Sequence, residues 1–149
     1  LDSVLAQTLM PTEIIIQDDN STDGTWAVLQ EYQQRYPNII RLYKNEKGLG
    51  AHLNFEKAFQ YVTADYIAPC DQDDIWIENK IELAVNSLNK LDDQKPNMAF
   101  GNSDYYDENM KFIGPGPKNK KVSFVKALFS CCGQGMTMTV NKKTRDMIC

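Results

Sequence analysis

The sequence predicts an α/β fold in which a mostly parallel sheet is flanked by helices. Short apolar runs alternate with segments of helical periodicity about 10 to 15 residues long, which is the pattern of βαβ units. Ile14, Ile15 and Ile16 form a continuous β-branched run, as expected for a strand covered on both faces. With 149 residues and 42% apolar composition, the chain suits one domain, residues 1–149, with its own core. Such units make right-handed crossovers.

The elements follow one another with clear boundaries. Helical periodicity opens the chain over residues 1–9, and Pro11 separates it from the strand at 14–16. Apolar residues then recur at helical spacing from Trp26 until Pro37 ends the helix. The further expected elements are a strand at 38–43, a loop and helix at 48–62, a strand at 65–70, a helix at 77–91, a strand at 97–103, a hairpin at 105–114 around Glu108 and Asn109, a helix at 124–129 and a strand at 135–141.

Composition excludes several classes of protein. The net charge is -4 and the 16 Lys and Arg residues are scattered, which argues against nucleic-acid binding. No stretch reaches the roughly 20 apolar residues of a membrane span, and no basic n-region precedes an apolar h-region at the start of the sequence. The four cysteines form no C-x-x-C pair, so reduced thiols in a cytoplasmic protein are expected. The helical periodicity begins at Leu1 itself, as expected if the sequence is a piece cut from a larger gene product.

Two acidic groups follow predicted strands. Asp18 and Asp19 end the first strand, and Asp71, Asp73 and Asp74 follow the strand at 65–70. In α/β sheets of this kind ligands bind beyond the carboxyl ends of the strands, so both groups are expected at one end of the sheet.

The three aspartates within four positions need a reason to lie together. They would repel one another and raise one another's pKa unless a cation held them. Oxygen ligands without His or Cys favour Mg²⁺ or Mn²⁺, with a diphosphate completing the coordination. The alternative is that these carboxylates cap the following helix, a role that fits Asp74 best. Ile75 and Trp76 would anchor that helix or close the pocket.

The first acidic pair allows two interpretations. Asp18 or Asp19 can accept hydrogen bonds from a nucleobase or ribose, while Ser21 or Thr22 caps the next helix. The same stretch matches the opening of a calcium loop, but its twelfth position is Gln30 instead of a bidentate Glu. Nucleotide binding is therefore the favoured interpretation.

Three blocks together resemble the family 2 glycosyltransferases of the GT-A fold, a Rossmann-like, mostly parallel sheet flanked by helices. The blocks are EIIIQDDNSTDGT, the N-x-x-G-x-G-x-x-x-N pattern that runs from Asn45 to Asn54, and ADYIAPCDQDDIW-x-x-N-K. The DQDDIW block is typical of the rhamnosyltransferase-like branch. The resemblance implies an inverting transfer of a sugar from a nucleotide-diphosphosugar donor to an acceptor hydroxyl.

The resemblance also assigns roles to residues. It implies that Asp18, Asp19, Asn45, Asn54 and Asp71 bind the nucleotide sugar, and that Asp71 and Asp73 hold the metal. The metal would stabilise the leaving nucleoside diphosphate. A looser match places Gly135, Met136 and Thr137 beside the sugar and the acceptor.

Two parts of the family pattern are missing from the sequence. The family's first strand is expected ahead of Leu1, and its loss would expose a sheet edge. The acidic general base is expected beyond Cys149, so no catalytic residue can be named.

The resemblance implies partners and a cellular setting as well. The donor would be of the UDP or dTDP type and the acceptor a saccharide or a lipid-linked saccharide, in bacterial cell-surface polysaccharide or lipopolysaccharide synthesis. The protein would be cytoplasmic, with possible peripheral association at the inner face of the membrane. The rival interpretations are a sugar nucleotidyltransferase and a non-catalytic module that binds a nucleotide sugar or a divalent cation.

Overall fold

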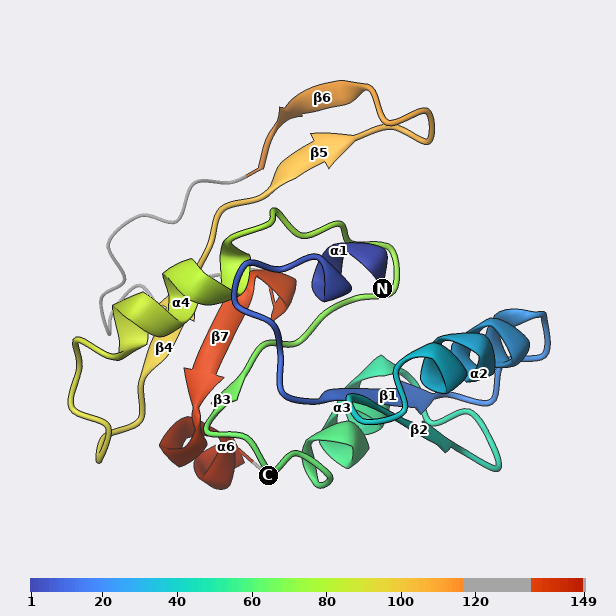
Figure 1. Ribbon diagram of the computed structural model, residues 1–149, viewed down its shortest axis with the longest axis horizontal. Helices are drawn as coiled ribbons and strands as arrows, with labels where there is room; N and C mark the ends of the chain where they lie inside the picture. Colours follow the sequence, from blue (N-terminus) through green and yellow to red (C-terminus); the bar gives the residue numbers. More distant parts are fainter. Residues whose placement is uncertain (117–134, 149) are drawn as a thin grey trace.

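The computed structural model describes residues 1–116 and 135–148 (Figure 1). Its helices are α1 (Asp2–Leu5), α2 (Thr25–Arg35), α3 (Ala51–Phe59), α4 (Lys80–Leu88), the 3-10 turn η1 (Gly135–Thr137) and α6 (Lys142–Ile148). Its strands are β1 (Ile14–Asp18), β2 (Ile40–Lys44), β3 (Tyr66–Ile67), β4 (Met98–Phe100), β5 (Asp104–Tyr106), β6 (Phe112–Pro115) and β7 (Met138–Asn141). Strands and helices alternate as the sequence predicts, and the fold is α/β.

The first two strands form a parallel pair. Ile14 lies opposite Ile40 and Asp18 opposite Lys44, with α2 as the crossover between the strands. Helix α2 packs on β2 and α3 packs on β1. The predicted βαβ unit is confirmed, and it brings Asp18 to the end of the pair where both strands finish.

A second sheet has the order β3-β7-β4, with β7 in the centre. Strand β7 runs antiparallel to both neighbours: Tyr66 lies opposite Asn141, and Phe100 lies opposite Met138. Alternating strands and helices predict parallel neighbours for the early strands, but a strand near the end of the chain can enter in either direction. The antiparallel centre is therefore a feature that periodicity alone did not specify.

Several elements are shorter than predicted, for identifiable reasons. Helix α1 ends at Leu5 because the next turn bonds elsewhere: the Thr8 amide donates to the Glu78 carbonyl (2.8 Å). Strand β3 stops after Ile67, and Pro69 has no amide hydrogen to continue the ladder. The helix predicted at 124–129 lies outside the described residues.

The buried apolar residues are few and come from α1, β2, β3, α4, β7 and the turn before α4. They are Val4, Ile40, Ile67, Trp76, Leu88 and Val140. The isoleucines of β1 are only half-buried, so the expectation that they are covered on both faces is wrong for the described structure. The reason is that β1 pairs with β2 on one edge, and no strand among residues 1–116 and 135–148 pairs with its other edge.

The helix α6, which the sequence analysis did not anticipate, begins directly after β7. Asn141 Oδ1 accepts a hydrogen bond from the Thr144 amide (3.1 Å), which is the bond of an asparagine N-cap. Arg145 Nη1 donates to the Val62 carbonyl (2.7 Å) and so ties α6 to the chain between α3 and β3. The Asn-Lys-Lys-Thr sequence was the available signal for this helix start.

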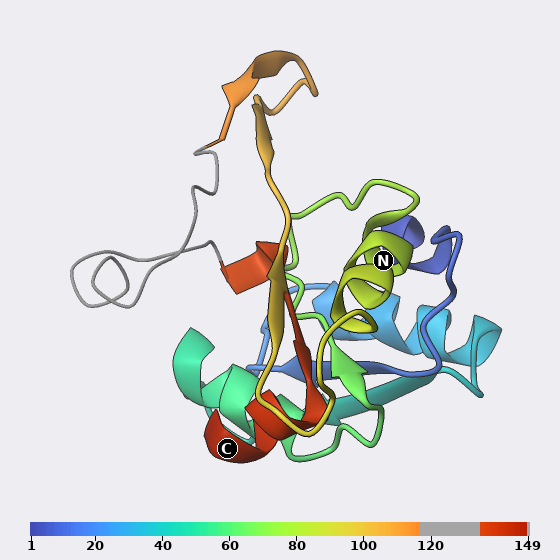
Figure 2. The same ribbon diagram turned by 90° about the vertical axis from the view of Figure 1, so that its left-hand side faces the viewer.

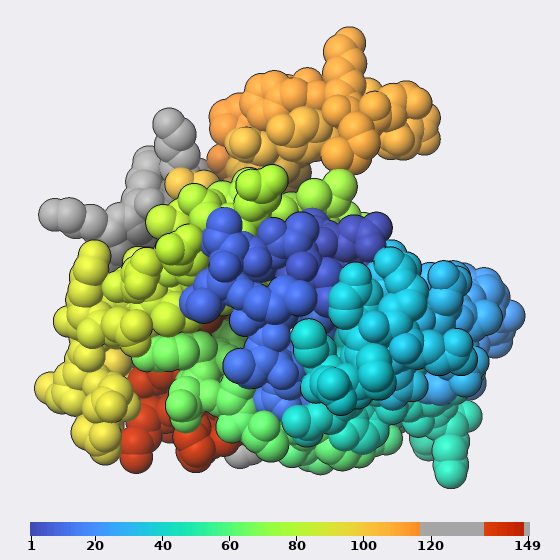
Figure 3. All heavy atoms as spheres, viewed as in Figure 1, coloured from blue at the N-terminus to red at the C-terminus, as the bar shows by residue number. Residues whose placement is uncertain are grey.

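The hairpin of β5 and β6 projects from the body of the molecule in both ribbon views and in the space-filling view (Figures 2 and 3). Its turn is closed by Asp107, whose Oδ1 accepts the amides of Asn109 and Lys111 at 2.9 Å each. The predicted hairpin around Glu108 and Asn109 is confirmed.

In the part of the chain that is described, no helix has the length and apolar character to cross a membrane.

Candidate nucleotide-sugar site

The end of β1 is shaped by the carboxylate of Asp18. This side chain is buried, and its Oδ2 accepts a hydrogen bond from the Ser21 amide (3.1 Å). Lys44, the residue opposite on β2, places Nζ 3.6 Å from the same oxygen. Asn20, which lies between Asp18 and Ser21 in the sequence, has a φ of 67°, a left-handed conformation that asparagine tolerates well. Asp18 therefore holds a tight turn directly after the strand.

Asp19 holds the glycine-containing loop that precedes α3. Its Oδ1 accepts from the Leu49 amide and its Oδ2 from the Gly50 amide, both at 2.8 Å. Gly50 has a φ of 81°, which a residue with a Cβ rarely adopts. The hydrogen bonds from the Leu49 amide and then from the Asn45 side chain hold the pKa of Asp19 below its ordinary value, so the carboxylate stays ionised.

Asn45 is the buried centre of a polar network whose other members, Gln17, Asp19, Asn54 and Lys57, are half-buried. It is 2% exposed, and its Nδ2 donates to Asp19 Oδ1 and Asn54 Oδ1 at 2.8 Å each. Its Oδ1 accepts from Gln17 Nε2 (2.9 Å) and Lys57 Nζ (2.8 Å). Asn54 Nδ2 in turn donates to the Gln17 carbonyl (2.8 Å). Three residues predicted for the nucleotide-sugar site thus lie together in one network.

The turn after Asp19 leads into α2 without the predicted cap. Helix α2 begins at Thr25, and its amide donates to Asp23 Oδ1 (2.9 Å). The expectation that Ser21 or Thr22 caps this helix is wrong, because the helix starts later in the chain. The hydrogen bonds from Thr25 keep the pKa of Asp23 below its ordinary value.

The second acidic group lies in the acid loop, residues 71–75, between β3 and α4. Asp71 and Asp74 are half-buried and Asp73 is exposed. The Asp74 amide donates to the Asp71 carbonyl (3.3 Å). Helix α4 begins only at Lys80, so the interpretation of Asp74 as its N-terminal cap is wrong. Trp76 is buried and its ring contacts Lys80, the first residue of α4, which fits the predicted role of a helix anchor. Ile75 is exposed and borders the groove described below instead of anchoring the helix.

The half-buried residues Cys70, Asp74 and Lys80 form a titratable cluster next to the acid loop. Burial and then the charges of Asp71 and Asp73 raise the pKa of Asp74. Lys80 Nζ lies 3.7 Å from the centre of the Trp76 ring, and burial lowers its pKa to about 8. Burial and then Asp74 raise the pKa of the Cys70 thiol to about 11. Three atoms of this cluster and of Trp76, namely Asp74 Oδ2, Trp76 Nε1 and Lys80 Nζ, are buried and have no hydrogen-bond partner among the described residues.

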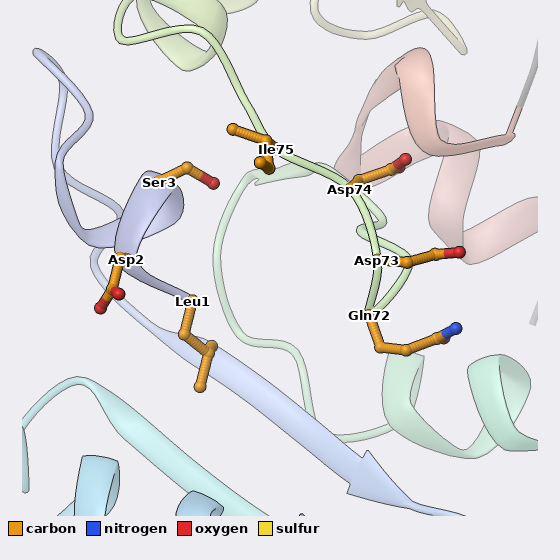
Figure 4. A pocket seen from close by; sticks show the side chains of 7 residues that line it. All are labelled: Leu1, Asp2, Ser3, Gln72, Asp73, Asp74 and Ile75. Atoms are coloured by element: carbon orange, nitrogen blue, oxygen red, sulfur yellow. The ribbon is translucent and has the colours of Figure 1, made fainter. Parts of the chain in front are cut away.

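A groove of about 430 Å³ borders the acid loop (Figure 4). It is lined by Leu1, Asp2, Ser3, Gln72, Asp73, Asp74 and Ile75. The side chains of Asp73 and Asp74 point to the same side of the loop, away from Leu1. The first residues of the chain therefore form one wall of the groove and the acid loop forms the other.

The structure brings the predicted residues together in two groups. Asp18, Asp19, Asn45 and Asn54 surround the end of the β1–β2 pair. Asp71 and Asp73 lie in the acid loop after β3, and no hydrogen bond or ion pair in residues 1–116 and 135–148 connects them to the first group. The same residues contain no set of three His, Cys, Asp or Glu side chains that could hold a metal ion by themselves.

The looser prediction for Gly135, Met136 and Thr137 falls on η1. The Thr137 side chain is buried, and its carbonyl accepts from the Gly101 amide (2.9 Å), just after β4. This bond places η1 at the end of the second sheet, next to the segment that leads into the hairpin.

The sequence analysis missed Lys57 and Gln7. Lys57 follows Asn54 at i+3 on α3, so helical spacing was an available signal for its place in the polar network. Gln7 lies in a stretch that looks like a continuing helix, and nothing in its neighbours shows that it is buried. The Gln7 side chain is 6% exposed, and it donates a hydrogen bond to the carbonyl of Ile77, beyond the acid loop.

The sequence of the chain matches known proteins over most of its length. The family model described as Glycosyl transferase family 2 matches residues 1–142. A dTDP-rhamnosyl transferase of Shigella flexneri, RfbG, is 31% identical over 97% of this chain and 50% of its own length. The Escherichia coli enzyme WfgD, a UDP-Glc:alpha-D-GlcNAc-diphosphoundecaprenol beta-1,3-glucosyltransferase, is also 31% identical, over 97% of this chain and 54% of its own length. The chain thus spans about half the length of these relatives.

Proposed function

The chain belongs to glycosyl transferase family 2, and we propose that it carries the donor-binding part of an inverting glycosyltransferase. The enzyme would transfer a sugar from a nucleotide-diphosphosugar to an acceptor hydroxyl. The observation that carries this proposal is the polar network around Asn45 at the end of a parallel strand pair, where α/β sheets bind ligands. The DQDDIW loop supplies carboxylates for the diphosphate end of the donor.

The polar network limits how the nucleoside would be held. Asp19 already accepts three hydrogen bonds, and a carboxylate has about four acceptor positions. One position therefore remains for a ribose hydroxyl or a base N–H. The Asp19 carboxylate is ionised and fixed before the donor arrives, so little conformational freedom would be lost on binding.

The acid loop fits a Mg²⁺ or Mn²⁺ ion that shares its ligands with the donor. Asp71 and Asp73 offer only carboxylate oxygens, which these ions prefer, and two protein carboxylates with substrate phosphates are a common set for Mg²⁺. When bound, such an ion supplies positive charge that stabilises the leaving diphosphate. Asp74 is half-buried and lies near Lys80, and no ligand role is assigned to it.

The names of the relatives support a role in surface polysaccharide synthesis. One relative is described as acting with a dTDP-linked sugar and another with a UDP-linked sugar and a lipid-diphosphate acceptor. We therefore propose a UDP or dTDP donor, a saccharide or lipid-linked acceptor, and work at the cytoplasmic face of the membrane. The acceptor's general base is not among the residues that the site assigns.

The test is calorimetric titration of the chain with UDP and with dTDP, each with and without Mn²⁺. We expect the Asp73→Asn variant to lose the metal-dependent part of the affinity, about 10-fold or more. Asp74→Asn is the matched control, and it should keep most of the metal-dependent affinity. Equal losses in the two variants would show that the roles within the loop are wrongly divided. Absence of nucleotide binding to the folded wild type would contradict the proposed function.

A further inference from the structure

The acid loop has little internal support. It belongs to the connection between Ile67, the last residue of β3, and Lys80, the first residue of α4. One backbone hydrogen bond, from Asp74 to Asp71 at 3.3 Å, lies within the loop. The carboxylates of this loop repel one another and the loop has few internal hydrogen bonds, so contacts with the rest of the molecule must hold it in place.

That support comes from the N-terminal clasp, residues 3–8, which bonds to residues 76–82. The Trp76 amide donates to Ser3 Oγ (3.1 Å), and the Thr8 amide donates to the Glu78 carbonyl (2.8 Å). Thr8 Oγ1 adds a hydrogen bond to Glu82 Oε2 (2.8 Å). The chain is therefore fixed immediately after the acid loop by residues about 70 positions away in the sequence.

Gln7 is the central residue of the clasp. Its Nε2 donates to the Ile77 carbonyl (2.7 Å) and to the Ser3 carbonyl (3.0 Å), and its Oε1 accepts from the Ile81 amide (3.0 Å). Ile81 lies in the first turn of α4, where Asn79 makes no side-chain cap. Gln7 thus takes the place of a helix cap, and it uses both ends of its amide to do so.

The residues that lead into the clasp form one wall of the groove in Figure 4, and the acid loop forms the other; Ser3 belongs to both the clasp and the wall. Leu1 to Ser3 lie opposite Gln72 to Ile75 there. A bond network that fixes residues 76–81 against residues 3–8 therefore sets how far apart these walls stand.

We propose that Gln7 is a positioning residue for the donor site: through Ile77 and Ile81 it fixes the course of the chain after the acid loop, and so the place of Asp71 and Asp73. This inference rests on the proposed function, in which those carboxylates hold the metal and the diphosphate. Gln7 itself touches neither. It acts as the outer residues of metal sites act, by orienting the ligands.

The experiment compares Gln7→Met with Gln30→Met, the same substitution at an exposed position on α2. Urea unfolding establishes that each variant is folded, and calorimetry measures the affinity for UDP and dTDP with and without Mn²⁺. We expect Gln7→Met to lower the metal-dependent gain in affinity by roughly 10-fold and to leave the metal-independent affinity unchanged. Gln30→Met should change neither quantity.

Two results would overturn the inference. One is a folded Gln7→Met variant with the wild-type metal dependence; the other is an equal loss of affinity with and without Mn²⁺, which would mean a general structural role. If Gln7→Met does not fold, Ser3→Ala, which removes the acceptor for the Trp76 amide, must show the same selective loss.

A wild-type chain without metal-dependent binding would contradict the proposed function, and the inference is then judged by amide hydrogen exchange. Gln7→Met should speed exchange in residues 71–75 and leave β7 unchanged. If exchange rises only at Ile81, which has lost its direct partner, Gln7 does not position the acid loop.

Discussion

At the scale of single residues, Asp19 and Asp74 show how the surroundings decide what an aspartate can do. Both follow strands, and both have acidic neighbours in the sequence. Asp19 is surrounded by N–H donors, so its pKa falls, whereas burial and two neighbouring carboxylates raise the pKa of Asp74. Sequence alone distinguishes the acidic groups from the rest of the chain, but it does not distinguish these two members.

A pH titration followed by NMR tests the role of Asp19. Because the folded pKa lies below the ordinary 3.8, its hydrogen bonds are fully present above that pH and are lost as the pH falls through the lowered value. The amide signals of Leu49 and Gly50 should therefore move together, with a midpoint below 3.8. A midpoint at or above 3.8 would show that Asp19 does not hold this loop.

Lys80 predicts a dependence of stability on pH in the alkaline range. Its pKa falls from 10.5 to about 8, so between these values the unfolded chain binds more protons and the free energy of unfolding rises with pH. Cys70, whose pKa rises from 9.0 to about 11, has the opposite effect above pH 9. Between pH 8 and pH 9, urea unfolding of the wild type should show a rise that Lys80→Met lacks. The same slope in both proteins would contradict a desolvated Lys80.

At the scale of elements, the sequence predicted the strands and helices better than their ends or partners. The parallel β1–β2 pair, the hairpin turn and the position of α4 followed from periodicity and turn residues. The end of α1 did not, because it depends on a bond between Thr8 and Glu78 that links distant parts of the chain. The capping role given to Asp74 failed for the same reason, since Gln7 supplies that bond from outside.

The polar network joins β1, β2 and α3, and its contribution can be measured. Asn45→Ala removes four side-chain hydrogen bonds of a buried residue and leaves half-buried groups of its neighbours with fewer partners. We expect the free energy of unfolding to fall by about 2 to 4 kcal/mol, measured with urea. Asn38→Ala, at an exposed position before β2, is the matched control and should have little effect. A similar small change in both variants would mean that the network does not stabilise this unit.

At the scale of the whole molecule, the candidate site draws on both sheets. The polar network belongs to the β1–β2 pair, and the acid loop follows a strand of the second sheet. Within residues 1–116 and 135–148, no three His, Cys, Asp or Glu side chains are grouped so that they could hold a metal ion without other ligands. The sequence indicated the polar network and the acid loop because their residues follow predicted strands. It did not show how far apart the two groups lie or that the clasp holds the acid loop, because both depend on contacts between distant parts of the folded chain.

The central claim is that these two groups form one donor site, and titration of the isotopically labelled chain with UDP and dTDP in the presence of Mg²⁺ tests it most directly. We expect the amides of residues 19–21 and 48–50 and those of residues 71–75 to shift with the same dissociation constant for one of these nucleotides. Repeating the titration with Mn²⁺ should broaden the signals of residues 71–75 first, because the paramagnetic ion would lie beside Asp71 and Asp73. Shifts confined to one group, or different dissociation constants for the two groups, would contradict a single donor site.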